Sequence, residues 1–224
     1  MQVTAGRWHG RLGEACRADA LSLRARVFRD GGCDADRFDD AAQHLVIWGP
    51  DGVAACARLM VQDRDGMVSG YTAQFYDLAR FAQTFACGVE MGRICLAPEV
   101  DAPDVTRLLL AMTAQVVTDA GADVLFGCAS FPETGAALAP LIGSEAPEAW
   151  RPAPKAVERV ALQGVGPRTG LPPLLRSYLA LGAKVSDHAV VDRDLGTVHV
   201  FTGLPVAAIS PVRAKLLRSL LAPA

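Results

Sequence analysis

The sequence has little of what a membrane-spanning or secreted protein requires. Its apolar runs, such as residues 108–112, are interrupted well before the roughly 18 apolar residues that a bilayer-spanning helix needs. Residues 1–7 lack the basic region and the apolar run of a secretory signal. Both absences predict a cytoplasmic protein.

Cysteine pairs at metal-binding spacing are also missing. The six cysteines are scattered singly along the chain: Cys16, Cys33, Cys56, Cys87, Cys95 and Cys128. Without a C-x-x-C pair or a nearby histidine, neither a zinc site nor a disulfide framework is indicated, so we expect no bound metal. Cysteine is among the most frequently buried residue types, and we expect reduced, mostly buried thiols.

Aromatic residues make up only 6% of the chain, but hydrophobic residues make up 51%, which excludes a disordered protein. A length of 224 residues without internal repeats favours a single domain over residues 1–224. Residues 144–154 are rich in proline, alanine and glutamate, which makes them a candidate loose break.

The net charge of −2 conceals an asymmetry along the chain. Residues 1–150 hold 12 basic and 20 acidic side chains, whereas residues 151–224 hold 10 and 4. The basic C-terminal third favours an acidic partner or an anionic membrane surface, with a simply solvated surface as the alternative. Its basic residues are not interleaved with aromatics, so we expect no nucleic-acid partner.

Hydrophobic periodicity and turn residues predict an α/β fold. Helices are expected over residues 21–29, 104–120, 171–181 and 211–221. Strands are expected over residues 44–48, 53–60, 88–96, 123–129, 185–191 and 198–204. Residues 49–52, Gly-Pro-Asp-Gly, predict a hairpin, and the strand, helix and strand over 88–129 predict a parallel crossover. The sheet is therefore expected to be mixed, mainly antiparallel and flanked by helices.

Charged residues stand within the predicted strands of the first hundred residues. Arg58 lies in the second strand, and Glu90 and Arg93 lie in the third. Ionisable groups in apolar strands are costly unless they are paired or used in chemistry. One explanation is an internal salt-bridge set in which Arg58 or Arg93 neutralises Glu90 or an aspartate, and the other is a functional site.

The first hundred residues resemble a known family. The motifs that carry the resemblance are Arg24-x-x-x-Phe28, Asp36-x-x-Asp39, Ala57-Arg58-Leu59 and Glu90-x-x-Arg93. In this order they resemble the acyl-homoserine lactone synthases, which belong to the GNAT-like acyltransferase superfamily and take acyl groups from acyl carrier protein. The resemblance implies a GNAT-like acyl-CoA N-acyltransferase fold.

The C-terminal half carries a more specific resemblance. Its motifs are Phe126-Gly127-Cys128-Ala129-Ser130-Phe131-Pro132, Leu171-Pro-Pro-Leu-Leu-Arg176-Ser-Tyr178-Leu-x-Leu-Gly182-Ala183 and Asp187-His188-Ala-Val-Val-Asp192-Arg193-Asp194-x-Gly196-Thr197-x-x-Val-Phe201. They look like the bacterial L-ornithine N-acyltransferases of ornithine-lipid synthesis. That resemblance covers about residues 20–215 and implies transfer of a 3-hydroxy fatty acyl group from acyl carrier protein to the α-amine of L-ornithine, giving lyso-ornithine lipid. It implies no cofactor, because phosphopantetheine arrives on the carrier protein.

The resemblance to the lactone synthases assigns the chemistry to Glu90 and Arg93. Amide formation from a thioester needs a deprotonated amine, and Glu90 is the candidate base, acting directly or through a water. Strict strand alternation puts the two residues on opposite faces, so either a bulge at Gly92 brings them together or they act apart. The N–H groups of such a bulge would hold the thioester oxygen.

Further residues are candidates for binding the amino acid. The substrate-binding set is Arg24, Phe28, Asp36, Asp39, Arg58, His188 and Asp192. Arg58 or Arg93 is the candidate partner of the amino acid's carboxylate, and one of the three aspartates in the set is the candidate partner of the ornithine side-chain ammonium. A structural histidine is the alternative for His188, and a turn before Gly196 is the alternative for Asp192.

The segment after the third strand bears on the acyl donor. GNAT enzymes that use acetyl-CoA carry an R/Q-x-x-G-x-G/A loop whose N–H groups hold the pyrophosphate, whereas residues 98–104 contain three carboxylates and no glycine. The predicted donor is therefore an acyl carrier protein. The basic candidates for docking it are Arg168, Arg176, Arg213, Lys215 and Arg218. An apolar tunnel for the acyl chain has as candidates Phe126, Phe131, Leu174, Leu175 and Phe201, with ordinary core as the alternative.

Three alternatives remain open at this point. The acceptor is glutamine or lysine in place of ornithine, the product is an acyl-homoserine lactone, or the protein binds acyl carrier protein without catalysis. The basic amphipathic helix expected over residues 211–221 is also a candidate for transient contact with the inner face of the membrane.

Overall fold

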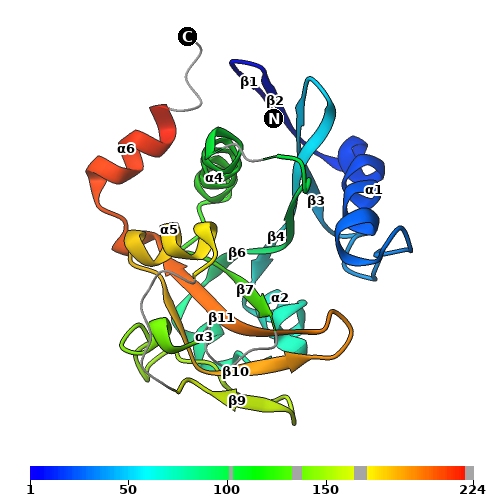
Figure 1. Cartoon of the computed structure of the whole chain (residues 1–224). Helices are drawn as coiled ribbons and strands as arrows, with labels where there is room; N and C mark the ends of the chain where they lie inside the picture. Colours follow the sequence, from blue (N-terminus) through cyan, green and yellow to red (C-terminus); the bar gives the residue numbers. More distant parts are fainter. Residues whose placement is uncertain (101–102, 133–137, 164–170, 220–224) are drawn as a thin grey trace. The chain divides into compact units, whose positions relative to one another are not determined.

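The computed structural model describes residues 1–100, 103–132, 138–163 and 171–219 (Figure 1). The chain forms two compact units. Unit 1 comprises Met1–Val61, Met91–Gly121 and Pro211–Ala224, and unit 2 comprises Gln62–Glu90 and Ala122–Ser210. The candidate break at 144–154 lies inside unit 2. Strands β4 (Gly52–Asp63) and β6 (Cys87–Leu96) each continue from one unit into the other.

Unit 1 is built on an antiparallel ladder. Its strands, in hydrogen-bonded order, are β1 (Gln2–Ala5), β2 (Trp8–Leu12), β3 (Gln43–Gly49), β4 and the second half of β6. The predicted hairpin of β3 and β4 is confirmed, because Gly49 pairs with Gly52 and Gly52 adopts a φ of 114°. A second hairpin joins β1 to β2 around Gly6, which also has a positive φ, and the sequence analysis missed it.

Among the described residues of unit 1, three segments are α-helical. They are α1 (Arg17–Phe28), α4 (Pro103–Asp119) and α6 (Pro211–Ser219). Helix α4 buries Leu108 and Met112, and Gly121 follows its end with a φ of 60°, as the sequence predicts. Helix α1 begins earlier than its predicted start at residue 21 and packs in one core cluster with Cys56 and Cys95.

Unit 2 contains the parallel crossover partner of β6. Next to the first half of β6, its strands follow in the order β7 (Val124–Pro132), β11 (Thr197–Pro205), β10 (Lys184–Asp192) and β9 (Arg159–Ala161). Strand β6 pairs with β7 in parallel, with Gly88 opposite Val124, whereas β7, β11, β10 and β9 pair antiparallel. The predicted mixed, mainly antiparallel sheet is confirmed.

Short helices cover the sheet of unit 2. They are α2 (Arg64–Ser69), α3 (Ala79–Thr84) and α5 (Pro173–Leu181). Helix α5 follows Pro172 and ends at Gly182, whose φ of 108° is left-handed. Single 3-10 turns occur at Glu14–Cys16, Thr72–Gln74, Ala139–Leu141 and Val206–Ala208.

An aromatic cluster forms the main core of unit 2. Phe81 lies within 6.0 Å, between ring centroids, of Phe126, Trp150 and Phe201. Tyr76 belongs to the same cluster and to the small sheet of β5 (Tyr76–Asp77) and β8 (Ala153–Pro154). Aromatic pairs contribute beyond their buried area, so this cluster fixes the segment after α2 against the sheet.

The remaining sequence expectations on burial are met in part. Cys16, Cys56 and Cys95 are buried, Cys87 and Cys128 are half-buried, and Cys33 is exposed. In the part of the chain that the structure describes, no helix combines the length and the apolarity needed to cross a membrane.

Candidate active site

A network of four arginines and three aspartates lies in unit 1. We call it the arginine–aspartate cluster, and its members are Arg24, Arg29, Arg58, Arg93, Asp34, Asp36 and Asp39. Arg24 on α1 binds Asp34 at 2.8 Å and Asp39 at 2.6 Å. Arg58 on β4 binds Asp36 at 2.5 Å, and Arg93 on β6 binds Asp34 at 3.0 Å. The internal salt-bridge explanation therefore holds for the pairing of these arginines with aspartates.

The cluster is most closed around Asp39. Its side chain is fully buried and accepts hydrogen bonds from Arg24, Arg58 and the backbone N–H of Asp36. Burial raises the pKa of Asp39, but the hydrogen bonds from Arg24 and the Asp36 backbone outweigh it and lower that pKa to about 2. With these partners, Asp39 is held as an internal anion.

The structure separates the predicted substrate residues of unit 1 by exposure. Arg24, Asp39 and Arg58 are at most 2% exposed, which places them inside the network. The side chain of Asp36 is 24% exposed and lies between Arg58 and Arg93. Phe28, at the end of α1, packs partly against the core. Among the acidic candidates of unit 1, Asp36 therefore has the surface to meet a ligand.

Asp34 was missed by the sequence analysis although it is central to the cluster. It is 3% exposed and accepts from Arg24, Arg29 and Arg93. The signal was its place in the same acidic run as Asp36, two residues earlier.

Strand β6 is irregular at Arg93. This residue has a φ of 50°, a left-handed conformation that is uncommon for a residue with a side chain. The break in strand regularity therefore falls one residue after Gly92, where the sequence places a bulge. Gly92 and Arg93 belong to unit 1, and Glu90 to unit 2.

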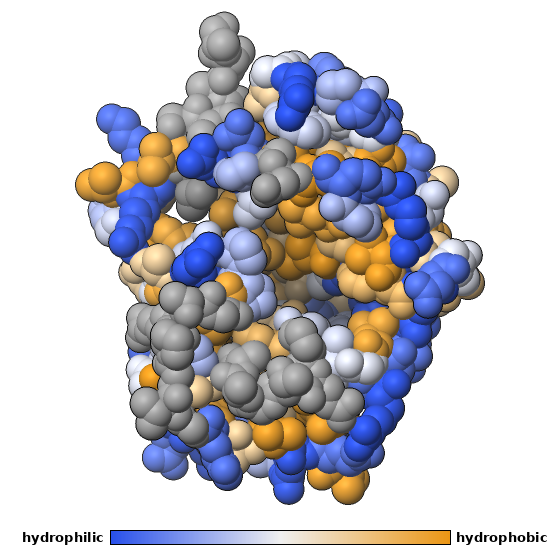
Figure 2. Space-filling model, in the orientation of Figure 1, coloured by the Kyte–Doolittle hydropathy of each residue, from blue (hydrophilic) through white to orange (hydrophobic). Residues whose placement is uncertain are grey.

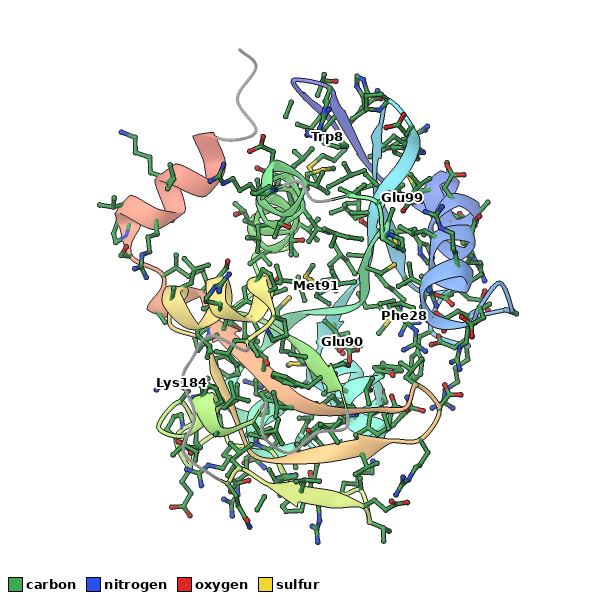
Figure 3. The ribbon with its side chains drawn as sticks, in the orientation of Figure 1. Trp8, Phe28, Glu90, Met91, Glu99 and Lys184 are labelled. Atoms are coloured by element: carbon green, nitrogen blue, oxygen red, sulfur yellow. The ribbon has the colours of Figure 1, made fainter. Side chains whose placement is uncertain are left out.

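Glu90 lies buried in unit 2, where Figure 3 shows it on β6 beside α2. It is 3% exposed, and its carboxylate accepts hydrogen bonds from three donors. The backbone N–H of Thr72 donates at 2.5 Å, that of Tyr71 at 3.2 Å, and Gln62 Nε2 at 3.0 Å. Glu90 thus ties the turn at Thr72–Gln74 to the sheet.

Gly70 packs directly against this carboxylate. A Cβ atom at Gly70 would lie 2.7 Å from Glu90 Oε2 and 2.5 Å from Gln62 Nε2, closer than atoms tolerate. Its φ of −68° is ordinary, so space and not backbone conformation requires glycine here. Gln62 is not among the residues predicted from the sequence, because the predicted strand ends at residue 60, whereas β4 continues to Asp63.

Two histidines and a tyrosine form a second buried polar group in unit 2. Tyr76 donates from its hydroxyl to the carbonyl of His199 at 2.8 Å, and its ring lies 5.3 Å from that of His188. His188 Nδ1 lies 2.7 Å from Asp187, and His188 is 8% exposed. His199 is 1% exposed, and burial lowers its pKa to about 4. His188 is among the candidates predicted from the sequence, whereas His199 is not.

The buried His199 makes unit 2 acid-sensitive. Because its pKa falls from 6.5 to about 4 on folding, the unfolded chain takes up the proton first as pH drops. The contribution of the neutral His199 to the free energy of unfolding is complete above pH 6.5 and is lost between pH 6.5 and 4. At pH 5 the loss is about 2 kcal/mol. Denaturant unfolding at pH 7.5 and pH 5 measures this loss, and His199→Phe is expected to reduce it by that amount.

Two features keep that experiment interpretable. His44 is also buried with a lowered pKa, so His199→Phe removes only part of the acid sensitivity. His9 is exposed on β2, and His9→Phe serves as the matched control. If His199→Phe loses as much unfolding free energy between pH 7.5 and pH 5 as the wild type does, His199 is not a source of the acid sensitivity.

The remaining candidates divide between turn, core and surface. Asp192 accepts from the N–H groups of Asp194 and Leu195 before Gly196, which is the turn role given as its alternative. Arg176 on α5 and Arg213 and Lys215 on α6 are exposed. Arg168 and the side chain of Arg218 lie outside the described residues.

The predicted tunnel residues lie mainly in the core of unit 2. Phe126 and Phe201 belong to its aromatic cluster, and Phe131 and Leu175 belong to a second cluster. Their alternative, ordinary core, describes their packing.

Among the described residues, no group of histidine, cysteine and acidic side chains is arranged to hold a metal ion.

Comparison with known proteins connects this geometry to a family. A model described as an acetyltransferase (GNAT) domain matches residues 21–111. An L-ornithine N(alpha)-acyltransferase of Brucella abortus is 31% identical over 201 residues, which cover 79% of this chain and 72% of the relative. One of the same name from Rhodobacter capsulatus is 31% identical over 197 residues, covering 79% and 76%.

A solved structure shares the fold. An N-acyl amino acid synthase from uncultured soil microbes superposes with a TM-score of 0.57 at 11% identity, over 92% of this chain and 97% of that one. The sequence relatives, the GNAT domain and the mixed sheet agree with one another. The chain is an acyltransferase of the GNAT fold and belongs to the L-ornithine N(alpha)-acyltransferase family.

Proposed function

We propose that the protein transfers a 3-hydroxy fatty acyl group from acyl carrier protein to the α-amine of L-ornithine, giving lyso-ornithine lipid. The observation that carries the proposal is the 31% identity to L-ornithine N(alpha)-acyltransferases over about four fifths of the chain. Within unit 2, a buried carboxylate at Glu90 offers the base that amide formation requires.

The proposed step conserves atoms and electrons. The lone pair of the ornithine α-nitrogen forms the new C–N bond to the thioester carbonyl carbon, and the C–S bond breaks to release the carrier thiol. The nitrogen loses one proton, which Glu90 accepts directly or through a water and which finally resides on the leaving sulfur. Three donors fix the Glu90 carboxylate, so its orientation is set before the amine arrives.

The segment after β6 supports a carrier-protein donor over coenzyme A. Residues 98–104 carry three carboxylates and no glycine, and the side chains of Glu99 and Asp104 are 64% and 72% exposed. Exposed carboxylates repel the pyrophosphate of coenzyme A, which a carrier-bound thioester lacks at this place.

Basic and apolar side chains are exposed on helix α6. Arg213 and Lys215 are exposed together with Val212 at 79% and Leu216 at 63%. Figure 2 shows hydrophilic and hydrophobic residues side by side where this helix lies, at the upper left. In our proposal this helix helps dock the acidic carrier protein or touches the membrane surface that receives the product.

Mass spectrometry of one reaction mixture tests the proposal. Purified protein is incubated with 3-hydroxyacyl carrier protein, ornithine, glutamine, lysine and S-adenosylmethionine, and a parallel reaction replaces the carrier protein with 3-hydroxyacyl-CoA. We expect acyl-ornithine from the carrier-protein donor. Acyl-glutamine or acyl-lysine would show that the acceptor is another amino acid, and a lactone would show that the protein is a signal synthase. Product from 3-hydroxyacyl-CoA but not from the carrier protein would show that the donor is coenzyme A-bound. No product from folded protein would contradict catalysis.

A further inference from the structure

Gln62, the penultimate residue of strand β4, lies beside the Glu90 carboxylate. Its Nε2 donates to Glu90 Oε2 at 3.0 Å, which fixes the orientation of the side-chain amide because a carboxylate oxygen accepts only from the nitrogen end. The other end of the amide, Oε1, is therefore an acceptor of known identity. Gln62 is 9% exposed and its Oε1 atom is buried, so this acceptor is held inside unit 2.

Gln62 Oε1 is buried without a hydrogen-bond donor among the described residues. A buried amide oxygen costs stability unless a donor is supplied. By contrast, the neighbouring carboxylate already receives three donors. The unmatched atom of this group is thus an acceptor on a neutral amide, next to a carboxylate.

The two oxygens lie close to each other on the same side of Gly70. The direction of the Gly70 Cβ bond points at both, 2.7 Å from Glu90 Oε2 and 3.1 Å from Gln62 Oε1 at its end. A primary amine that attacks a carbonyl through its lone pair still carries two N–H bonds. One acceptor is needed for the proton that leaves, and a second is needed for the proton that stays.

We propose that Gln62 is a substrate-binding residue whose Oε1 accepts the N–H that remains on the acceptor amine, while Glu90 receives the other proton. This inference rests on the proposed function. Gln62 forms and breaks no covalent bond. Its two hydrogen bonds, one from Nε2 to Glu90 and one from the amine to Oε1, hold the nitrogen lone pair in a single direction.

Gln62→Met tests the inference, because methionine keeps the size of the side chain and removes both amide groups. Loss of one hydrogen bond to the amine raises the KM for ornithine about tenfold, while the KM for the acyl donor stays within about twofold. Gln83, exposed on α3, gives the matched control Gln83→Met, which leaves both constants unchanged.

A second substrate sharpens the test. Nα-methylornithine offers one N–H fewer, so the wild type is expected to prefer ornithine, and Gln62→Met is expected to lose much of that preference. If Gln62→Met does not fold, Gln62→Asn retains the amide, withdraws it by one methylene, and is expected to shift the KM for ornithine in the same direction.

Each outcome separates this inference from the proposed function. Wild-type protein that makes no acyl-ornithine contradicts the proposed function. Turnover by the wild type, together with an unchanged KM for ornithine in folded Gln62→Met, overturns the role of Gln62 alone and means that Oε1 holds a buried water. A parallel rise of both KM values also overturns it, because that pattern indicates a structural role.

Discussion

Glu90→Gln is expected to lower kcat at least about 100-fold while the protein stays folded. The substitution keeps the shape of the side chain and removes the charged group that accepts the proton. Its amide oxygen still accepts from Thr72, but its new NH2 group takes the place of Oε2 and meets two donors, Tyr71 N–H and Gln62 Nε2. Each such mismatch costs about 1–3 kcal/mol, which a typical domain survives.

The measurement combines steady-state rates with thermal unfolding of the same preparation. Glu99→Gln is the matched control, because the side chain of Glu99 is 64% exposed and pairs with the exposed Arg26. Glu99→Gln is expected to keep the wild-type rate. A folded Glu90→Gln protein with wild-type turnover would remove Glu90 from the proposed step.

Arg24→Met is expected to destabilise unit 1 by about 3–5 kcal/mol, which lowers Tm by about 10 °C. Arg24 donates to both Asp34 and Asp39, and all three side chains are at most 1% exposed. Its removal leaves two buried carboxylates short of their nearest cation, and methionine restores volume without charge. Thermal or denaturant unfolding at pH 7 measures the loss.

At acid pH the difference in stability between Arg24→Met and the wild type is expected to become smaller. The pKa of Asp39 is lowered to about 2 in the folded protein, so its stabilisation is present above about pH 4 and is lost as pH falls through 2. Arg17→Met is the control: its partner Asp40 is 75% exposed, and the expected effect is within about 1 kcal/mol. An Arg24→Met protein as stable as Arg17→Met would show that the network contributes little.

The elements marked by local chemistry could be predicted from the sequence. Gly52, Gly121 and Gly182 all have positive φ and stand where the hairpin turns and the helices end. Helices α2 and α3 could not be predicted, because each has only six residues and no apolar periodicity to read. They are held by tertiary packing, with Met67 and Phe81 fully buried in the aromatic core.

In the candidate site, too, the residues marked by local chemistry could be predicted from the sequence. Charges inside apolar strands pointed to Arg58, Glu90 and Arg93, because burying a charge needs an explanation. The partners of Glu90 could not be read, because two of its three donors are backbone N–H groups, which carry no residue signature. Gln62 and His199 could not be predicted either, because both are polar and only the structure shows that they are buried.

The segments of the two units alternate along the sequence, and this bears on the order in which the units fold during synthesis. Unit 1 consists of three separate stretches of sequence. Its helices α4 and α6 contact each other, although Ala122–Ser210 lies between them in the sequence. Closing so long a loop costs chain entropy before the contacts form. During synthesis, every stretch of unit 2 leaves the ribosome before Pro211–Ser219 does. The order of translation therefore favours unit 2 as the first unit to fold, with unit 1 completed last.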